Sequence, residues 1–245
     1  MNRWLGIFAI LLAVNCSAIA QPSDAFVRAN EAYAAGDFEE AIELYDSIVQ
    51  QGQFSAALFY NLGNAWYRTG DHGKAILHYQ RALALEPAHP EALANLRLVR
   101  DKARALELRK NRMERAVERG TATQWTMVAA AGFWTAAFAL AFWLMSLRRT
   151  AGVLTTVVLA LLVAAAAGAA LYVRETGSHG RDLAVVTAKE TQARLATADS
   201  AGTVLVLPAG SEIKVLSTRG DWLYAQLPND QRGWIPAGGA ERVRL

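Results

Sequence analysis

Apolar and polar residues follow three different patterns along the chain, and each pattern predicts a different kind of element. In residues 22–119, apolar positions recur three and four residues apart, as in amphipathic helices. Residues 125–147 and 151–173 are two apolar stretches without an Asp, Glu, Lys, Arg or His. From residue 182 on, short apolar runs alternate with turn residues, which is typical of β-strands. The predicted fold is therefore multidomain, α then β, with two long apolar helices in between.

The two apolar stretches are each long enough to cross a membrane, because about 20 apolar residues span the hydrocarbon core. Only Arg148, Arg149 and Thr150 separate them, which is enough for a tight turn. We therefore expect a transmembrane hairpin with both flanking regions on the same side of the membrane. Small residues four apart (Gly132/Ala136 and Ala164/Gly168) favour close helix contact, although the abundance of Ala could produce this spacing by coincidence.

Residues 1–20 have the parts of a secretory signal peptide. Arg3 precedes an apolar core, Leu5 to Val14, and Ala18-Ile19-Ala20 is a cleavage site of small residues. An uncleaved anchor and a lipoprotein signal at Cys16 are alternatives, and all three export the region that follows. Export places Arg148 and Arg149 in the cytoplasm, as the positive-inside rule favours. Both soluble modules would then lie on the periplasmic side of a bacterial inner membrane.

A second group of basic residues on the flank of the first span opposes this orientation. Its members are Arg109, Lys110, Arg112, Arg115 and Arg119. Taken alone, they would place the N-terminal region in the cytoplasm. The signal peptide outweighs them, because long exported segments translocate largely regardless of their charge. The basic residues could instead lie along anionic lipid head groups.

The helical region contains an internal repeat of 34 residues. Gly36-Asp37-Phe38 is echoed by Gly70-Asp71-His72, and Tyr45 is echoed by Tyr79. This period and the residues that recur in it resemble the tetratricopeptide repeat. The matching residues of the second copy are Leu62, Gly63, Trp66, Tyr67, Ala75, Tyr79, Ala82 and Pro87. The resemblance predicts two repeats, over residues 22–55 and 56–89, followed by a capping helix over residues 90–119.

Tetratricopeptide repeats bind an extended segment or a helix of a protein partner on their concave face. The residues that we expect on this face are Asn30, Tyr60, Asn61, Asn64, Tyr67 and Arg68. Asn30 and Asn61 match two positions of the carboxylate-clamp subfamily, but Phe26 and Glu91 stand where the clamp has lysines. Alternatively, these Asn residues are ordinary consensus positions that bond between neighbouring helices.

The C-terminal region, residues 182–245, follows a Gly- and Ser-containing stretch that we predict to be a linker (174–181). Five strands are predicted, at Leu183 to Ala188, Gly202 to Leu207, Glu212 to Ser217, Trp222 to Leu227 and Arg232 to Ile235. Short strands in this number suggest a small barrel. Leu223, Ala225 and Leu227 alternate with larger or polar residues and should face its core.

This region resembles a bacterial SH3 domain. The matching segments are Ala184-Val185-Val186, Leu207-Pro208-Ala209-Gly210, Gly220-Asp221-Trp222-Leu223 and Gly233-Trp234-Ile235-Pro236. The family's Arg-x-x-Pro segment is incomplete here, because Thr197 stands in place of the Pro. The residues expected to bind a proline-rich or cell-wall peptide are Trp222, Tyr224, Trp234 and Pro236. Alternatively, the Trp residues only close the barrel core.

Composition and motifs exclude several function classes. The net charge is +3 and no basic helix or zinc-finger spacing occurs, so we expect no nucleic-acid binding. The one cysteine, Cys16, cannot form a disulfide within the chain. Ionisable residues are absent from both spans, which argues against a transporter or channel. We find no catalytic or cofactor motif, and we expect the four His residues (His72, His78, His89 and His179) to be solvated. We therefore expect that the protein is not an enzyme and that it holds no cofactor or metal.

The order of these parts resembles the E-type members of the Bacteroides aerotolerance (Bat) family. The resemblance covers nearly the whole chain and rests on its architecture: a signal peptide, tetratricopeptide repeats, two spans and an SH3-like domain. It implies a scaffold in a membrane complex with von Willebrand factor A-domain proteins and a MoxR-type AAA+ ATPase, associated with oxygen tolerance and envelope stress. The competing interpretation is a membrane protein that binds peptidoglycan through the SH3-like domain.

Overall fold

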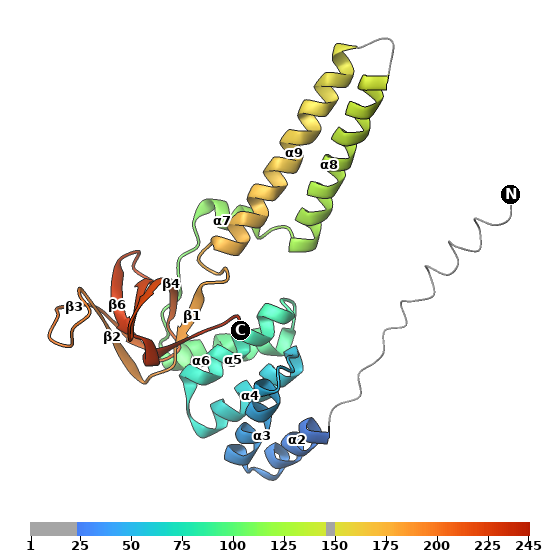
Figure 1. The fold of residues 1–245 in the computed structure, drawn as a ribbon. Helices are drawn as coiled ribbons and strands as arrows, with labels where there is room; N and C mark the ends of the chain where they lie inside the picture. Colours follow the sequence, from blue (N-terminus) through green and yellow to red (C-terminus); the bar gives the residue numbers. More distant parts are fainter. Residues whose placement is uncertain (1–23, 146–149) are drawn as a thin grey trace. The chain divides into compact units, whose positions relative to one another are not determined.

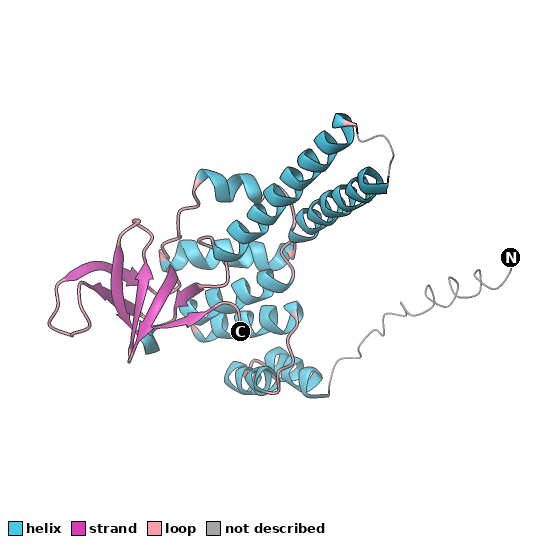
Figure 2. Cartoon of the chain, turned by 45° about the horizontal axis from the view of Figure 1, so that its top comes forward, coloured by secondary structure: helices cyan, strands magenta, loops and turns pink. Residues whose placement is uncertain are grey.

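The computed structural model describes residues 24–145 and 150–245 and divides into two compact units, with the boundary between Gln53 and Phe54. The predicted signal peptide (1–20) and the Arg148-Arg149 turn lie outside the described residues. Figure 1 labels the elements along the chain, and Figure 2 separates the helices from the strands by colour. Each unit is described by itself.

The first unit contains the helices of the first predicted repeat, α2 (Asp24–Ala35) and α3 (Phe38–Gln50). Small residues let the two helices pack closely, since Ala29 and Ala41 are fully buried. Tyr45 is buried against them, and its hydroxyl donates a hydrogen bond to Asn30 Oδ1 at 2.6 Å. The first copy of the sequence repeat therefore forms a helical hairpin.

The second unit begins with the second repeat, α4 (Ala56–Thr69) and α5 (His72–Leu85). The Ser55 side chain caps the start of α4, and the Asp71 side chain caps the start of α5. Gly63 lies against the ring of Tyr79, so a larger residue there would push the two helices apart. The small residue and the aromatic residue thus pack against each other, as the repeat pattern predicts.

The predicted capping helix over residues 90–119 is wrong as a single element. Helix α6 (Pro90–Ala103) ends where Arg104 adopts a positive φ of 51°, and a separate short helix α7 (Arg112–Val117) follows. The extended segment between them hydrogen-bonds to the C-terminal domain: the Glu212 amide donates to the Leu106 carbonyl at 2.8 Å. Leu108 of the same segment is buried. The apolar spacing alone predicts that α6 continues. The helix ends because the following segment makes contacts with the distant C-terminal domain.

Residues 182–245, here called the β-domain, form a seven-stranded antiparallel sheet with the order β3-β2-β6-β5-β4-β1-β7. The strands are β1 (Leu183–Val186), β2 (Glu190–Arg194), β3 (Thr203–Pro208), β4 (Glu212–Arg219), β5 (Trp222–Gln226), β6 (Arg232–Pro236) and β7 (Ala240–Arg242). Five match the predicted strands, and Ala225 and Leu227 face the core as expected. Strands β2 and β7 were not predicted, because both are mostly polar and β7 has only 3 residues.

The second repeat and the β-domain share one hydrophobic core. A single cluster of buried side chains joins Ile76 and Tyr79 of α5, Val99 of α6 and Val185 of β1, together with Val243 near the C-terminus. The stretch that was predicted to be a linker is also ordered: helix α9 extends through Thr176, and Ser178 is buried. The second repeat and the β-domain are thus parts of one folded body.

The two apolar stretches form the antiparallel helices α8 (Ala122–Met145) and α9 (Ala151–Thr176), which lie side by side (Figure 1). Both are long and apolar enough to cross a membrane. Their large side chains point away from the partner helix; Trp134 and Phe138 are 57% and 69% exposed. Such outward apolar surface is typical of helices whose solvent is lipid, because water would not favour it.

Gly132 lies at the contact between α8 and α9, whereas Gly168 does not. A Cβ at position 132 would come within 2.9 Å of the Ala160 carbonyl oxygen and 3.1 Å of the Ala164 side chain. Nothing lies within 4 Å of a Cβ at position 168, which faces away from α8. The prediction that small residues form the contact between the two helices therefore holds for Gly132 of α8. It does not hold for Gly168 of α9, which lies outside the contact.

This difference predicts unequal effects of two similar substitutions. Gly132→Leu should force the helices apart and destabilise the hairpin by about 1–3 kcal/mol, as overpacking does in closely packed interiors. Gly168→Leu adds the same side chain to the outer surface and should change the stability by much less. Thermal unfolding of both variants in detergent measures the difference. Equal unfolding temperatures would contradict the helix contact described here.

Candidate functional site

Two of the residues expected on the repeat face are used for packing within the repeats. The Tyr79 hydroxyl donates to Asn64 Oδ1 at 2.7 Å, the equivalent of the Tyr45–Asn30 bond in the first unit. Asn64 Oδ1 also accepts a hydrogen bond from Asn95 of α6 at 3.0 Å. Asn30 thus makes the bond between neighbouring helices that the alternative interpretation expects, and Asn64 makes the equivalent bond in the second repeat.

The other four predicted residues of the repeat face lie on α4. Tyr60 packs between Tyr79 and His89, with ring centroids 6.1 and 5.0 Å away. The Tyr67 ring lies 5.0 Å from the Lys102 ammonium, Asn61 is half-buried and Arg68 is exposed. Tyr67 and Arg68 consequently remain the best placed for a partner, and that role stays a prediction.

The structure brings all four predicted residues of the β-domain together on one face of the sheet. Trp222 lies opposite Pro236, and Tyr224 lies opposite Trp234 in the β5–β6 pairing. The rings of Tyr224 and Trp234 have centroids 4.9 Å apart. Neither tryptophan belongs to the buried core, which contains Ala225 and Ile235 on the opposite face of these strands. These four residues, here called the aromatic face, form a half-buried apolar surface.

The sequence did not indicate the most connected polar site of the described residues, which surrounds Glu212 of β4. This carboxylate is fully buried and has four partners, on α5, on α6, in the segment after α6 and in the segment after α9. Gln80 Nε2 donates at 2.7 Å, the Leu108 amide at 3.0 Å and His179 Nε2 at 3.1 Å. The Arg100 guanidinium forms an ion pair with it. These residues are called the Glu212 junction below.

The junction keeps Glu212 ionised although it is buried. Burial by itself raises the pKa of the Glu212 carboxyl, since a charge is poorly solvated inside the protein. The hydrogen bond and the charge of His179, the charge of Arg100 and the Leu108 amide outweigh it and hold the pKa below its ordinary value. The junction thus pairs the charge with donors from the second repeat, the segment after α6 and the residues that follow α9.

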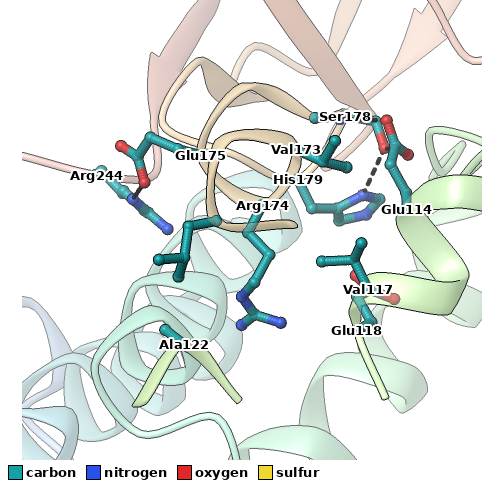
Figure 3. Close-up of a pocket in the computed structure, with 12 residues that line it drawn as sticks. Glu114, Val117, Glu118, Ala122, Val173, Arg174, Glu175, Ser178, His179 and Arg244 are labelled. Carbon is teal, nitrogen blue, oxygen red and sulfur yellow. Dashed lines mark hydrogen bonds and ion pairs between the residues drawn. The ribbon is translucent and has the colours of Figure 1, made fainter. Parts of the chain in front are cut away.

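His179 connects this junction to a second carboxylate, Glu114 of α7. The Ser178 hydroxyl donates to Glu114 at 2.6 Å and lies 3.1 Å from His179 Nδ1 (Figure 3). His179 Nε2 lies 3.1 Å from Glu212, so the ring stands between Glu212 and the Ser178–Glu114 pair. Through Ser178 and His179, helix α7 is thus connected to the Glu212 junction.

Two expectations about histidines are wrong. His78 was expected in solvent, but it is buried and its ring stacks on Phe59 at 6.0 Å. Burial, followed by the nearby charges of Arg81 and Lys74, lowers the pKa of His78 well below its ordinary value, so it stays neutral. His179 was expected in a solvated linker and instead forms the ion pair with Glu212. Sequence position alone could not show either packing partner.

The Glu212 junction predicts acid-sensitive packing of the β-domain. The pKa of Glu212 and that of Glu114 are both lowered from the ordinary glutamate value of 4.5. For Glu114, burial raises the pKa and is the largest single effect, but the hydrogen bonds from Ser178 and Asn111 together outweigh it. Folding therefore gains stability above pH 4.5 that is lost as the pH falls through the lowered folded-state values. Chemical unfolding between pH 7 and pH 3 should show a steeper loss in the wild type than in Glu212→Gln. Equal slopes for the two proteins would contradict the assignment.

No metal or cofactor chemistry emerges from the side chains that the structure describes. Within residues 24–145 and 150–245, no group of three or more His, Cys, Asp or Glu is placed to hold a metal ion. The polar clusters are paired internally, as in the Glu212 junction. The candidate sites for binding other molecules are therefore surfaces: the repeat face on α4, the aromatic face on β5 and β6, and the apolar sides of α8 and α9.

Comparison with known proteins agrees with the helical part of this description. A family model of the tetratricopeptide repeat matches residues 26–92. The chain is also 42% identical over 62 residues to a probable biofilm formation methyltransferase, WspC, of Pseudomonas putida. That match covers 25% of this chain and only 15% of the methyltransferase. The chain thus contains a tetratricopeptide-repeat region next to two potential membrane-spanning helices, and the short match does not extend the methyltransferase activity to it.

Proposed function

We propose that this protein is a membrane-anchored scaffold that binds protein partners through its repeats and its β-domain. The observation that carries the proposal is the shared core of the second repeat and the β-domain, which is reinforced by the fully buried Glu212. Because they form one body, a partner that touches both meets surfaces with a fixed separation. Fixed surfaces bind with a smaller loss of conformational entropy than two flexibly tethered ones.

The repeat region supports the protein-binding part of the proposal. Tetratricopeptide repeats hold a partner segment without doing chemistry on it, and helix α4 leaves Arg68 exposed and Tyr67 half-buried. An aromatic ring and a guanidinium are the side chains most often important at protein interfaces. The repeat face therefore fits a peptide or helix that carries an apolar and an acidic residue.

The β-domain supplies the second binding surface. Its aromatic face has the composition of grooves that bind proline-rich segments, with two Trp rings, a Tyr and a Pro within two paired strands. The resemblance of the domain to bacterial SH3 domains favours the same role. We assign partner binding on this domain to Trp222, Tyr224, Trp234 and Pro236.

The compartment and the partners follow from the sequence features already described. The signal peptide favours export, so that both modules would lie on the periplasmic side and Arg148-Arg149 in the cytoplasm. The resemblance to the Bat family points to von Willebrand A-domain membrane proteins and to a complex that includes a MoxR-type AAA+ ATPase. In that complex the protein would hold partners beside one patch of membrane and raise their effective concentration.

Purification of the intact protein from its own membranes in mild detergent tests this proposal. We expect A-domain proteins, and with them the AAA+ ATPase, to be recovered. Replacing Trp222 and Trp234 with alanine, or Tyr67 and Arg68 with alanine, should reduce the recovery, while Lys189→Ala at an exposed position outside both faces should not. Equal recovery by all variants would exclude the two assigned faces.

Binding to the cell wall is the second candidate function, and the aromatic face is the observation that favours it. The chemistry that stacks on a proline-rich segment also suits the apolar side of a peptidoglycan stem peptide. Sedimentation of the intact protein with purified sacculi distinguishes the two functions. Sedimentation that depends on Trp222 and Trp234, without recovery of A-domain proteins, would favour wall binding over the scaffold.

A further inference from the structure

A pocket of about 370 Å³ lies where the two long helices meet the rest of the second unit. Its apolar side is formed by Ala122 of α8 and by Leu171 and Val173 of α9, and its polar side by Arg174, Glu118 and Glu175. Apolar side chains thus give way to charged ones within a few residues of α9. In a membrane this transition marks the level of the lipid head groups.

Arg174 is the charge in this pocket that the protein does not neutralise. Its guanidinium donates one hydrogen bond, at 3.0 Å, to the Gly120 carbonyl between α7 and α8. Among the residues that the structure describes, no carboxylate lies within 4 Å of it. Figure 3 shows its side chain in the middle of the pocket, between Ala122 and Val117. The rest of the guanidinium is therefore able to bind an anion.

The acidic residues of the pocket are each paired with another group. Glu118 accepts from Lys110 at 2.6 Å, and Glu175 accepts from Arg244 at 2.8 Å. Glu114 is held by the hydroxyl and the amide of Ser178, at 2.6 and 3.1 Å. Since these carboxylates are satisfied, an incoming anion would not have to displace them from Arg174.

The surroundings of the pocket add positive charge. Helix α7 exposes Arg112 and Arg115, and Arg119 follows it. Met113 of the same helix is 64% exposed, and the Trp125 indole fixes the end of α7 by donating to the Val117 carbonyl at 2.9 Å. A short basic segment with an exposed apolar residue next to a span is typical of contact with an anionic membrane surface.

We infer that this pocket binds the head group of an anionic phospholipid. The phosphate lies on Arg174, and the acyl chains follow the apolar side formed by Leu171 and Ala122. The exposed arginines of α7 favour an anionic over a zwitterionic lipid. This inference rests on the insertion of α8 and α9 into a membrane, which is part of the proposed function. It gives the basic residues beside the first span a role that does not conflict with export.

The test uses the intact protein in a neutral detergent, with phosphatidylglycerol as the probe. We expect native mass spectrometry to show about a fivefold preference for retained phosphatidylglycerol over phosphatidylcholine, the size of effect that one cation beside an anionic lipid produces. Phosphatidylglycerol should also raise the thermal unfolding temperature, whereas inorganic phosphate should not. Equal retention of both lipids would overturn the inference, and stabilisation by inorganic phosphate alone would replace the lipid with a free anion.

Four variants test whether the lipid preference depends on the pocket. Arg174→Gln should remove the preference, Arg174→Lys should keep part of it, and Arg232→Gln on the exposed side of β6 should leave it unchanged. Because Arg174 also bonds to Gly120, its loss could affect folding, so Leu171→Trp provides a second test by filling the apolar side while keeping every cation. An unchanged preference in folded Arg174→Gln and in Leu171→Trp would overturn the site.

Failure of this inference is distinguishable from failure of the proposed function. Alkaline extraction of membranes measures whether the protein is integral. If the protein is extracted, the membrane scaffold itself is excluded. If it stays in the membrane but shows no preference among lipids, only the head-group site is excluded.

Discussion

Replacing Glu212 with alanine should lower the free energy of unfolding of the second unit by about 3–5 kcal/mol, the cost of removing one partner of a buried ion pair. The substitution leaves Arg100 beside an empty, desolvated space and removes the acceptor of Gln80 and of the Leu108 amide. It also removes the carboxylate that His179 Nε2 contacts. Chemical unfolding in detergent, followed by circular dichroism, measures the change.

Glu107→Ala is the matched control for this prediction. Glu107 also pairs with Arg100, at 3.2 Å, but its side chain is 56% exposed. Solvent screens such a pair, so its loss should cost about 1 kcal/mol or less. Glu212→Gln keeps the volume and one acceptor and should fall between the two. If Glu212→Ala cost no more than Glu107→Ala, the junction would not hold the second unit together.

Gly210→Ala should be the second large effect, because two independent penalties coincide at this turn between β3 and β4. Gly210 has a φ of +83°, which costs an L-residue roughly 1–2 kcal/mol. A Cβ at this position would also collide with the Cδ1 atom of Ile76, a fully buried residue of α5. Overpacking adds about 1–3 kcal/mol, so a total of about 2–5 kcal/mol is expected.

Two further variants separate these penalties. Gly220 has a φ of +54° with nothing within 4 Å of a Cβ, so Gly220→Ala should show only the backbone cost. Ile76→Val removes the colliding Cδ1 atom and should rescue part of the loss in Gly210→Ala. A double-mutant cycle of unfolding free energies measures this coupling. Absence of coupling would mean that the β3–β4 turn and α5 do not touch.

The sequence was sufficient to predict the elements that depend on local pattern. The apolar stretches, the second repeat and the five stronger strands follow from side-chain periodicity, because each element buries one face or faces lipid throughout. Strand β2 was missed, since only Thr191 and Ala193 are buried in it and both are small. A polar strand of this kind depends on its neighbours for its stability and leaves little pattern of its own.

The junction could not be predicted, because its residues are far apart in the chain. Gln80 and Glu212 are separated by 132 positions, and each looked like an ordinary surface residue on its own element. The same holds for His179, which has no apolar neighbours to suggest burial. The aromatic face was predictable, because alternation along β5 and β6 places its four residues on the side opposite the core.

The central claim is that the second repeat and the β-domain act as one rigid recognition unit. The most direct measurement is the distribution of distances between spin labels on Arg97→Cys of α6 and Arg219→Cys of β4, both exposed, with Cys16 replaced by serine. We expect one narrow distribution in the intact protein and a broader one when Glu212→Ala is added. A broad distribution in the protein with an intact junction would show that the two modules move independently and would contradict the account.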